Sequence, residues 1–325
     1  MHLLEHSPNL SVEAAADLAR VLYGISATAR SLPSERDQNF LLTTETTERF
    51  VLKIANALEE RSLLVAQNAL MSYLASRVDF SQRIVKTLTG DELATFNDYF
   101  VRLVTYIPGT TLAKIDSSSP EVLRDLGRKL GKLDQILSDF DHPALHRDFH
   151  WDLRNGSRII QQNAPLIHDQ YLSDIVRRCA AQVENYDSVA QLRRSIIHGD
   201  ANDYNVIVEG ARVVGLIDFG DAVYSYTVGD LAVALAYVVL DKEEPLQVAA
   251  EVVRGYDEVH PLTEDEFSVL FDLMLLRLSM SVCHAAHQQK AQPQNEYLNI
   301  SQAAIRKKLP ELARLDREEA IKTWL

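Results

Sequence analysis

The pattern of hydrophobic and polar positions changes character near residue 105. Before that point, short runs rich in β-branched and aromatic residues predict strands over 38–44, 48–54 and 99–105. Between the last two strands, residues 59–76 carry apolar side chains at helical spacing, which predicts a helix. The first third of the chain is therefore expected to form a small lobe built on an antiparallel sheet.

Longer amphipathic segments follow the predicted hinge at Pro108 and Gly109, where regular structure must stop. Ser119 and Pro120 suit the cap and first position of a helix. The expected helices run over about 121–138, 166–187, 227–240, 245–259 and 263–289. The predicted class is α+β: residues 1–105 form a strand-rich N-terminal lobe, and residues 106–325 form a larger, mainly helical C-terminal lobe.

Composition and charge narrow the possible environments and partners. The chain has 325 residues with 46 acidic and 33 basic side chains, a formal charge of −13, which argues against nucleic acid as a partner. Cys179 and Cys283 are too few to suggest a disulfide framework. The start lacks a signal-peptide pattern, and the longest apolar run, 231–240, is too short to span a bilayer. We therefore expect a cytoplasmic protein without a membrane partner.

Two short segments in the second lobe carry the most informative chemistry. The first, residues 198–205, reads His-Gly-Asp-Ala-Asn-Asp-Tyr-Asn, and the second, residues 217–220, reads Ile-Asp-Phe-Gly. The intervening residues predict two short strands joined at Glu209 and Gly210. Such a hairpin brings Asn205 and Asp218 side by side, next to Asp200. A base carboxylate with two oxygen ligands for magnesium is what a kinase requires.

This combination resembles the aminoglycoside phosphotransferase and choline kinase superfamily, whose members have the bilobal protein-kinase-like fold. Within the superfamily, further segments are similar to the hydroxylysine kinase-like branch. These segments are residues 34–40 (Ser-Glu-Arg-Asp-Gln-Asn-Phe), 50–54 (Phe-Val-Leu-Lys-Ile), 67–68 (Gln-Asn) and 146–152 (His-Arg-Asp-Phe-His-Trp-Asp). The resemblance covers most of the chain and makes residues 1–105 the nucleotide-binding lobe and residues 106–325 the catalytic and acceptor-binding lobe.

The resemblance assigns roles to the catalytic motif. Asp200 is expected to steer the acceptor hydroxyl in line with the γ-phosphate of ATP or GTP. Asn205 and Asp218 are expected to hold Mg²⁺, and His198 is expected to be structural. An ordinary turn carboxylate is the competing interpretation of Asp200. The spacing to Asn205, the hairpin and the second acidic segment together favour the catalytic one.

The nucleotide site is expected in the first lobe. Lys53 interrupts an otherwise apolar strand, and the family lysine at this place contacts the α- and β-phosphates. Its usual glutamate partner on the next helix is replaced by Gln67, so either Gln67 suffices or another acid reaches Lys53. A strand lysine that extends to solvent is the simpler alternative.

Two further segments complete the expected nucleotide site. Ser34 and Arg36 belong to a polar loop without glycine, placed where phosphates would be covered; an ordinary hairpin loop is the alternative. Residues from Thr105 to Ile107 align with the hinge whose backbone contacts the purine. Backbone contacts leave little signature in side chains, so the sequence does not choose between ATP and GTP.

The acceptor wall is expected at residues 146–152. The resemblance makes Trp151 an aromatic surface and directs Asp148 and Asp152 toward an ammonium group, while Asp221 adds to metal or acceptor contacts. A polar loop is the second interpretation of this segment. A zinc site ranks last: the histidines at 142, 146 and 150 have helical spacing, but Pro143 disfavours a continuous helix.

The expected function is transfer of the γ-phosphoryl group to the hydroxyl of an amino alcohol or hydroxylated amino acid, such as hydroxylysine. The expected partners are therefore a nucleotide, Mg²⁺ and a small-molecule acceptor. A non-catalytic nucleotide-binding pseudokinase of the same fold is the alternative, supported only by Gln67. A protein kinase is disfavoured because no activation-loop length or Ala-Pro-Glu segment follows residue 220.

Overall fold

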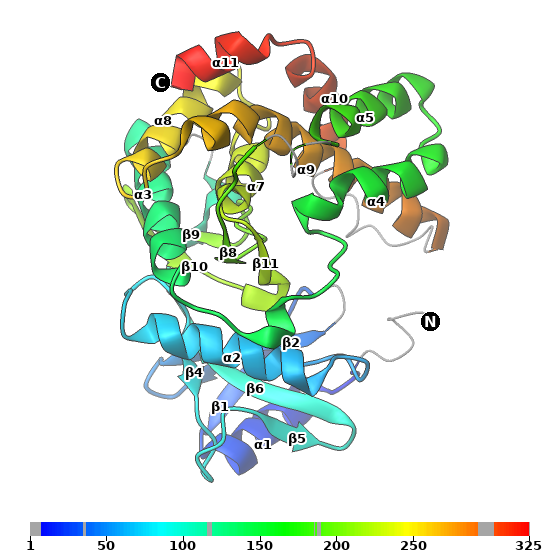
Figure 1. The fold of residues 1–325 in the computed structure, drawn as a ribbon. Coiled ribbons are helices and arrows are strands. Elements are labelled where there is room, and N and C mark those ends of the chain that lie inside the picture. The colour runs from blue at the N-terminus through cyan, green and yellow to red at the C-terminus, as the bar shows by residue number, and fades with distance from the viewer. Residues whose placement is uncertain are drawn as a thin grey trace. The chain divides into compact units, whose positions relative to one another are not determined.

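The computed structural model describes residues 8–34, 37–115, 119–184, 186, 190–291 and 302–324. The chain divides into two compact units, residues 1–108 and 109–325 (Figure 1). The first unit is built on an antiparallel sheet and the second is mainly helical, which is the predicted α+β class. The division falls between Pro108 and Gly109, three residues after the predicted lobe boundary.

The sheet of the first unit has the strand order β1-β2-β3-β6-β4, with β5 also paired to β6 and all pairs antiparallel. The bounds are β1 Ala27–Leu32, β2 Gln38–Thr44, β3 Arg49–Ile54, β4 Ile84–Val85, β5 Ala94–Phe96 and β6 Tyr99–Thr105. The three predicted strands correspond to β2, β3 and β6. Strand β3 pairs with β6 although 44 residues, including α2, lie between Ile54 and Tyr99.

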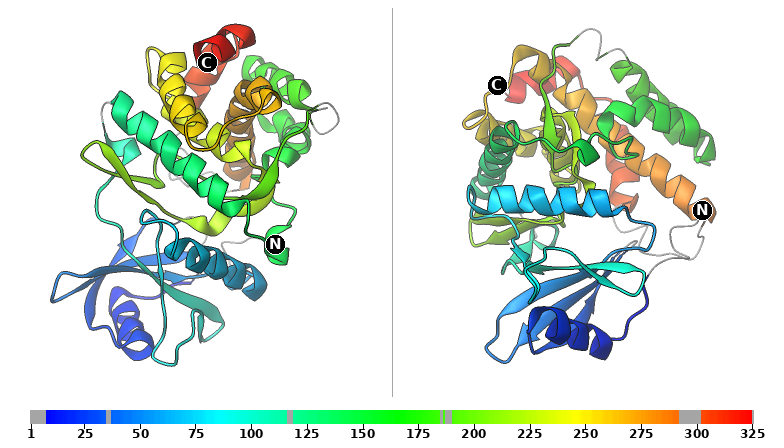
Figure 2. Two further views of the ribbon diagram at one scale, coloured as in Figure 1. Left: turned by 60° about the vertical axis from the view of Figure 1, so that its left-hand side comes forward. Right: turned by 60° about the horizontal axis from the view of Figure 1, so that its bottom comes forward.

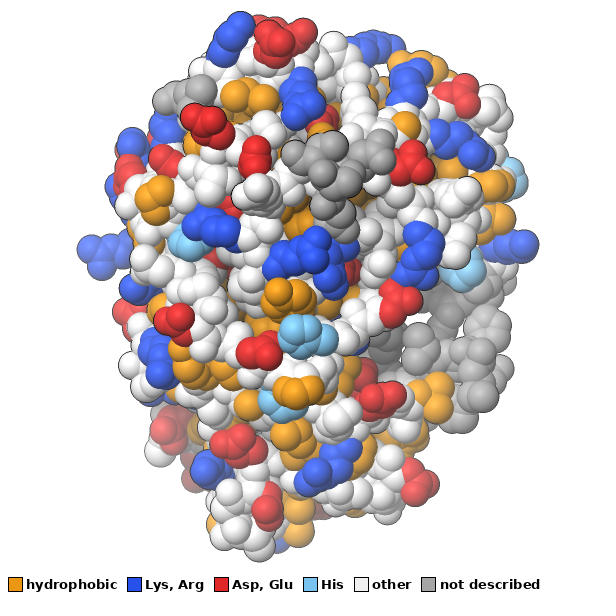
Figure 3. Space-filling model, in the orientation of Figure 1, with side chains coloured by type: hydrophobic (Ala, Val, Ile, Leu, Met, Phe, Trp, Pro, Cys, Tyr) orange, Lys and Arg blue, Asp and Glu red, His pale blue; other side chains and the backbone are white. Residues whose placement is uncertain are grey.

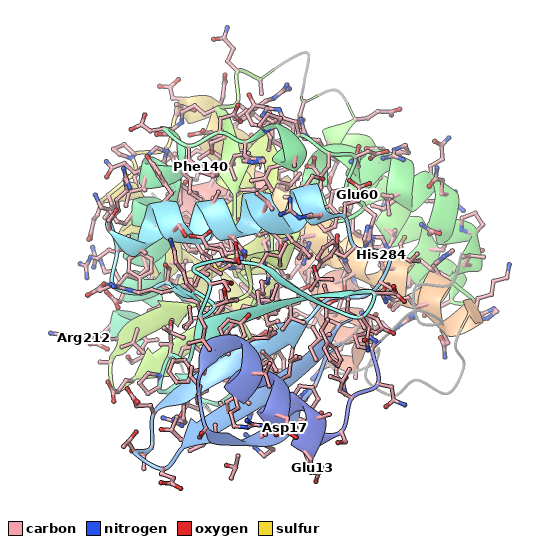
Figure 4. All side chains as sticks on the ribbon, turned by 90° about the horizontal axis from the view of Figure 1, so that it is seen from below. Glu13, Asp17, Glu60, Phe140, Arg212 and His284 are labelled. Carbon is pink, nitrogen blue, oxygen red and sulfur yellow. The ribbon has the colours of Figure 1, made fainter. Side chains whose placement is uncertain are left out.

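Two helices lie on opposite faces of this sheet (Figures 1 and 2). Helix α1, Val12–Tyr23, packs its apolar side against sheet residues such as Leu52 and Leu103. Glu13 and Asp17 occupy its exposed side (Figure 4). Helix α2, Arg61–Ala75, was predicted, whereas α1 was not.

The second unit contains most of the helices. They are α3 Pro120–Leu137, α4 Gly156–Asn163, α5 Gln170–Val183, α7 Val228–Val238, α8 Pro245–Asp257, α9 Glu264–Ala291, α10 Gln302–Leu312 and α11 Arg317–Trp324. Ser119 caps α3 by accepting from the Val122 N–H, as its sequence predicts. The expected 166–187 helix is shorter in the structure, because residues 164–166 form a short 3-10 turn and α5 spans Gln170–Val183. Helices α4, α10 and α11 were not predicted.

Helices α3 and α8 cross at a close contact made by two glycines. A Cβ atom at Gly127 would lie 2.0 Å from the Val252 carbonyl oxygen, and one at Gly255 would lie 2.0 Å from the Arg124 carbonyl oxygen. Any side chain at either position would therefore separate the helix backbones. This crossing fixes α3 against the rest of the helical unit (Figure 2).

Helix α9 runs through the centre of the second unit (Figure 1). It is long and apolar enough to cross a membrane by length and composition, which corrects the expectation that every apolar segment is too short. Its apolar window is, however, entirely buried inside the protein, as in the core helix of a globular unit.

Charges of both signs are interspersed on the face shown in Figure 3, so the acidic excess is not gathered there.

Two small sheets of the second unit carry the two motif loops, residues 198–205 and 217–220. The first has the order β10-β9-β7, from β7 Thr110–Thr111, β9 Val206–Glu209 and β10 Arg212–Leu216. The second pairs β8 Arg194–Ile197 with β11 Val223–Tyr226. Strands β9 and β10 form the predicted hairpin, and Gly210 has the positive φ of 59° that such a tight turn requires.

Candidate active site

The loop 198–205 begins where β8 ends, and a buried carboxylate holds its first residues. Asp230, fully buried in the first turn of α7, accepts hydrogen bonds of 2.7 Å from the backbone N–H groups of His198 and Gly199. Gly199 has a φ of 79°, and a Cβ there would lie 2.7 Å from the Asp221 carbonyl oxygen. Asp230 thus holds the first residues of this loop from the start of α7.

His198 is part of the loop's internal scaffold. Its Nδ1 accepts from the backbone N–H of Asp200 at 3.2 Å, and its Nε2 lies 3.0 Å from the carbonyl oxygen of Ile217. An amide needs an acceptor and a carbonyl needs a donor, so the imidazole is neutral with its proton on Nε2. The side chain is fully buried and joins the two motif loops, in agreement with a structural role.

Asp200 is held at both carboxylate oxygens. Its Oδ1 accepts from Arg277 Nη2 at 2.8 Å, and its Oδ2 accepts from Asn205 Nδ2, also at 2.8 Å. Burial raises the pKa of Asp200 to about 7; Arg277 opposes this shift, while the charges of Asp221 and Asp218 add to it. A carboxyl group with a pKa near neutrality is suited to accept a proton from an alcohol during transfer.

The hairpin places the two proposed metal ligands at its open end. Asn205 directly precedes β9 and Asp218 follows β10 after one residue, and the Ile217 N–H donates to the Asn205 carbonyl oxygen at 3.0 Å. Asn205 Nδ2 also donates to the Asp200 carbonyl oxygen at 2.9 Å. Because this nitrogen is committed to Asp200, the side-chain oxygen of Asn205 is the atom directed elsewhere.

Asp218 adopts a conformation that is uncommon for a residue with a side chain. Its φ of 65° and ψ of 78° turn the chain sharply after β10, and its Oδ1 accepts from the Gly220 N–H at 3.3 Å. A carboxylate and an amide oxygen at one hairpin end form a hard donor set of the kind that Mg²⁺ prefers. The residues present therefore fit a magnesium ion.

Arg147 supports the second motif loop and was not predicted to do so. Its Nη2 donates to the carbonyl oxygens of Gly220 and Ala222 at 3.0 and 3.1 Å, and its guanidinium lies 4.1 Å from the centre of the Phe149 ring. No local pattern predicts this contact, because it joins residues more than 70 positions apart.

The zinc interpretation of the histidines is wrong. Residues 143–145 form a single 3-10 turn, so the histidine spacing does not correspond to one helix face. His146 Nε2 instead lies 2.6 Å from Asp141 Oδ1, and its ring stacks on Tyr224 with centroids 4.2 Å apart. Within the described ranges, no group of three or more histidine, cysteine or acidic residues is arranged to hold a metal.

The geometry also corrects the role expected of Asp152. Its side chain is fully buried: Oδ2 accepts from Arg154 Nη2 at 2.7 Å, and Oδ1 accepts from Ser225 Oγ at 2.5 Å. An ammonium group has no access to a carboxylate whose two oxygens are both buried and bonded. Asp152 therefore fastens its own loop to β11 and does not face an acceptor.

Asp148 and Trp151 have different surroundings. Asp148 is 71% exposed and forms an ion pair with Arg158 through Oδ1, to which Asn155 also donates. Trp151 packs its ring 4.2 Å from that of His284 and 4.2 Å from the Arg277 guanidinium carbon. Burial lowers the pKa of His284 to about 3, so its imidazole is neutral. Trp151 thus contacts Arg277, which in turn bonds Asp200.

In the first unit, Lys53 points to the side of the sheet that faces α2. It is the direct cross-strand partner of Arg102, whose Nη1 donates to Asn68 Oδ1 at 3.2 Å. Gln67 and Asn68 are both buried on α2. The side of α2 next to Lys53 and Arg102 therefore carries two amides, where the resemblance predicts a glutamate.

The other predicted nucleotide contacts are placed unequally. Ser34 is half-buried after β1, and Arg36 lies outside the described residues. Thr105 uses its N–H to bond the Arg83 carbonyl oxygen at 2.9 Å, and its own carbonyl accepts from Gln82 Nε2 at 3.2 Å. Both backbone groups of Thr105 are thus committed within the sheet, which shifts the expected purine contacts toward Ile107.

Comparisons with known proteins place this site in a family. Residues 28–267 match the phosphotransferase enzyme family. The chain is 33% identical to hydroxylysine kinase of Danio rerio, covering 100% of this chain and 97% of that protein. It is 32% identical to hydroxylysine kinase of Xenopus laevis, with 99% and 95% covered.

The fold matches solved structures of kinases. A complex of amicoumacin kinase hAmiN with AMP-PNP, Ca²⁺ and Ami superposes with a TM-score of 0.73 at 15% identity, covering 95% of this chain and 97% of that one. The chain therefore belongs to the phosphotransferase enzyme family and has its protein-kinase-like fold. It is a small-molecule kinase that uses a nucleotide and a divalent metal to phosphorylate a hydroxyl group.

Proposed function

We propose that this member of the family transfers the γ-phosphoryl group of ATP or GTP to the hydroxyl of a hydroxylated amino acid or amino alcohol, with hydroxylysine as the leading candidate. The observation that carries this proposal is the arrangement of Asp200, Asn205 and Asp218 on two loops joined by the β9–β10 hairpin. The full-length similarity to hydroxylysine kinases supports the acceptor class.

Asp200 orients the acceptor oxygen and takes its proton as this oxygen bonds to the γ-phosphorus. The bond from that phosphorus to the β-phosphate oxygen breaks, which releases the nucleoside diphosphate. Its pKa of about 7 suits this exchange with an alcohol near neutral pH. Asn205 and Asp218 hold Mg²⁺, which when bound offsets negative charge on the β- and γ-phosphates. Arg147 and Asp230 keep the two motif loops in place through their bonds to backbone groups.

Lys53 contacts the α- and β-phosphates, and Gln67 takes the place of the usual glutamate beside it. Ser34 and Arg36 cover the phosphates, and the backbone near Ile107 contacts the purine. An amide at position 67 accepts a hydrogen bond from an ammonium without neutralising it. Lys53 and Arg102 are cross-strand neighbours, so two cationic side chains lie on the side of the sheet where the phosphates are proposed to bind.

The acceptor lies against Trp151, with Asp221 and the exposed oxygen of Asp148 near its ammonium group. The charge of Asp221 raises the pKa of Asp200, which supports a role for this acid near the reacting hydroxyl. Asp152 is left out of the acceptor site because it is buried in its pair with Arg154. This assignment favours acceptors that carry a positive amine near the hydroxyl.

A pseudokinase remains the second candidate, and it rests on Gln67 alone. Against it stand the intact grip on Asp200, the hairpin that presents Asn205 and Asp218, and the clamp on the loop backbone by Asp230. Asp200 stays 22% exposed while both of its oxygens are held, which suits a carboxylate that acts on a substrate and is not needed for nucleotide binding alone.

A phosphoryl-transfer screen tests both candidates. Purified protein with Mg²⁺ and either ATP or GTP is offered hydroxylysine, homoserine, ethanolamine and lysine, the last as a matched amine without the hydroxyl. We expect acceptor-dependent nucleoside diphosphate release and a phosphorylated product with hydroxylysine, and none with lysine. Nucleotide binding without transfer to any hydroxylated acceptor would favour the pseudokinase.

A further inference from the structure

A buried arginine, Arg277, bonds the carboxylate of Asp200. Arg277 lies on α9 with its side chain only 2% exposed, and its Nη2 donates to Asp200 Oδ1 at 2.8 Å. We propose that Arg277 is a positioning residue for phosphoryl transfer: it fixes the orientation of Asp200 toward the acceptor hydroxyl. This inference rests on the proposed function, because it concerns the same site.

The grip on Asp200 has two points. Arg277 holds Oδ1, and Asn205 Nδ2 holds Oδ2 at 2.8 Å. A carboxylate bonded at both oxygens does not rotate about its Cβ–Cγ bond without breaking one of these contacts. Transfer requires the acceptor oxygen in line with phosphorus, and a misplacement of about 1 Å costs roughly a hundredfold in rate. Losing Arg277 would remove the contact at Oδ1 and leave Asp200 to its amide partners, Asn205 and Asn202.

The guanidinium is itself held by aromatic rings. Its central carbon lies 4.2 Å from the centre of the Trp151 ring and 5.7 Å from that of Tyr237. A buried cation without a partner has a large cost in free energy, so the bond between Arg277 and Asp200 is strongly favoured. Stacking fixes the plane of the guanidinium, and this plane sets the direction of the Nη2–H bond.

Trp151 links this arrangement to the proposed acceptor wall. His284, two turns after Arg277 on α9, packs on Trp151 with ring centroids 4.2 Å apart, and its Nε2 lies 2.9 Å from the His150 carbonyl oxygen. Residues 150–151 are thus fastened to α9 at two places. A shift of Trp151 would move Arg277, and this movement would change the orientation of Asp200.

The experiment compares Arg277→Met, Arg277→Lys and the control Arg317→Met in phosphoryl transfer. Arg317, on α11, lies 3.3 Å from the buried carboxylate of Asp272 on α9, so the control removes another arginine–aspartate pair that involves α9 but lies away from the site. For Arg277→Met we expect kcat to fall about a hundredfold while the nucleotide KM stays within about twofold. Lysine should restore part of kcat, because it keeps the charge but not the planar fork.

A double-mutant cycle separates positioning from stability. If Arg277 acts through Asp200, adding Arg277→Met to Asp200→Asn lowers kcat no further. Two losses that multiply would overturn the proposal, as would a wild-type kcat for folded Arg277→Met. Thermal unfolding identifies the folded variants; if Arg277→Met does not fold, Arg277→Lys decides by the same kcat comparison.

The wild-type protein distinguishes this inference from the proposed function. If the wild type phosphorylates none of the hydroxylated acceptors, the proposed function fails and the positioning role fails with it. If the wild type is active and the Arg277 variants match it, only the positioning role is rejected.

Discussion

Two short segments of the helical unit each carry two aspartates but use them differently. Residues 198–205 contain one histidine and residues 146–152 contain two, and both segments lie outside regular strands. In the first, Asp200 is held by Arg277, which lies 77 positions away, and by Asn205 at the hairpin end. In the second, Asp152 and Asp148 are paired with arginines 2 and 10 positions away.

The difference shows that the partners of an acid, and not the number of acids, decide its chemistry. Asp152 is fully buried, and both of its oxygens bond groups that fasten the loop, so it stabilises the fold. Asp200 keeps 22% of its side chain exposed while its pKa is raised to about 7. A carboxylate that is firmly held and still reachable can act on a substrate.

The largest expected effect comes from Asp200. Replacing Asp200 with Asn removes the proton acceptor but keeps the shape, so kcat should fall by about 10² to 10⁴. Phosphoryl transfer to hydroxylysine at saturating nucleotide measures the effect, and thermal unfolding shows that the variant is folded. An active folded Asp200→Asn protein would end the distinction between the two segments.

Asp152 should show the reverse pattern. Asp152→Ala leaves the half-buried Arg154 without its carboxylate and Ser225 without its acceptor, which should cost about 3 kcal/mol of unfolding free energy. Urea unfolding measures this loss. The kcat of the folded fraction should stay near that of the wild type; a fall as large as that of Asp200→Asn would place Asp152 in the chemistry after all.

The carboxyl group of Asp134, behind the catalytic loop, sharpens the comparison through pH. Burial, then the charge of Asp230, raises the pKa of Asp134 well above its ordinary value of 3.8, while Tyr256 donates to its Oδ2 at 2.6 Å. The folded protein therefore keeps a proton that the unfolded chain releases above about pH 4, and this lowers stability as pH rises.

Asp134→Asn removes that dependence, since an amide carries the donor permanently. The variant should gain stability relative to the wild type as pH increases from 5 to 8, as measured by urea midpoints at each pH. A stability difference that does not change with pH would show that Asp134 is ionised in the folded protein.

The smallest effect is expected at Asp148. Its pair with Arg158 is largely exposed, so Asp148→Asn should change the unfolding free energy by less than about 0.5 kcal/mol. If its second oxygen faces the acceptor ammonium, the KM should rise a few-fold for hydroxylysine and stay unchanged for an acceptor without an amine. Equal KM changes for both acceptors would remove Asp148 from the acceptor site.

Local signals predicted much of the fold. The hairpin of β9 and β10 followed from two β-branched runs around Glu209 and Gly210, and the start of α3 followed from Ser119 and Pro120. Helix α1 was not predicted from the sequence, although its apolar residues Leu18 and Tyr23 are buried against the sheet. The glycine crossing of α3 and α8 also left no signal, because it depends on which two helices meet.

The sequence by itself determined the reaction class, since Asp200, Asn205 and Asp218 lie on two loops joined by one hairpin whose geometry is set by neighbouring residues. Only the tertiary structure decided which acids are reachable and which are neutralised, because burial and ion pairing depend on distant segments. Arg277 reaches Asp200 through the packing of α9, and Ser225 reaches Asp152 through the pairing of β8 with β11. Such contacts join residues more than 70 positions apart and follow from no local pattern.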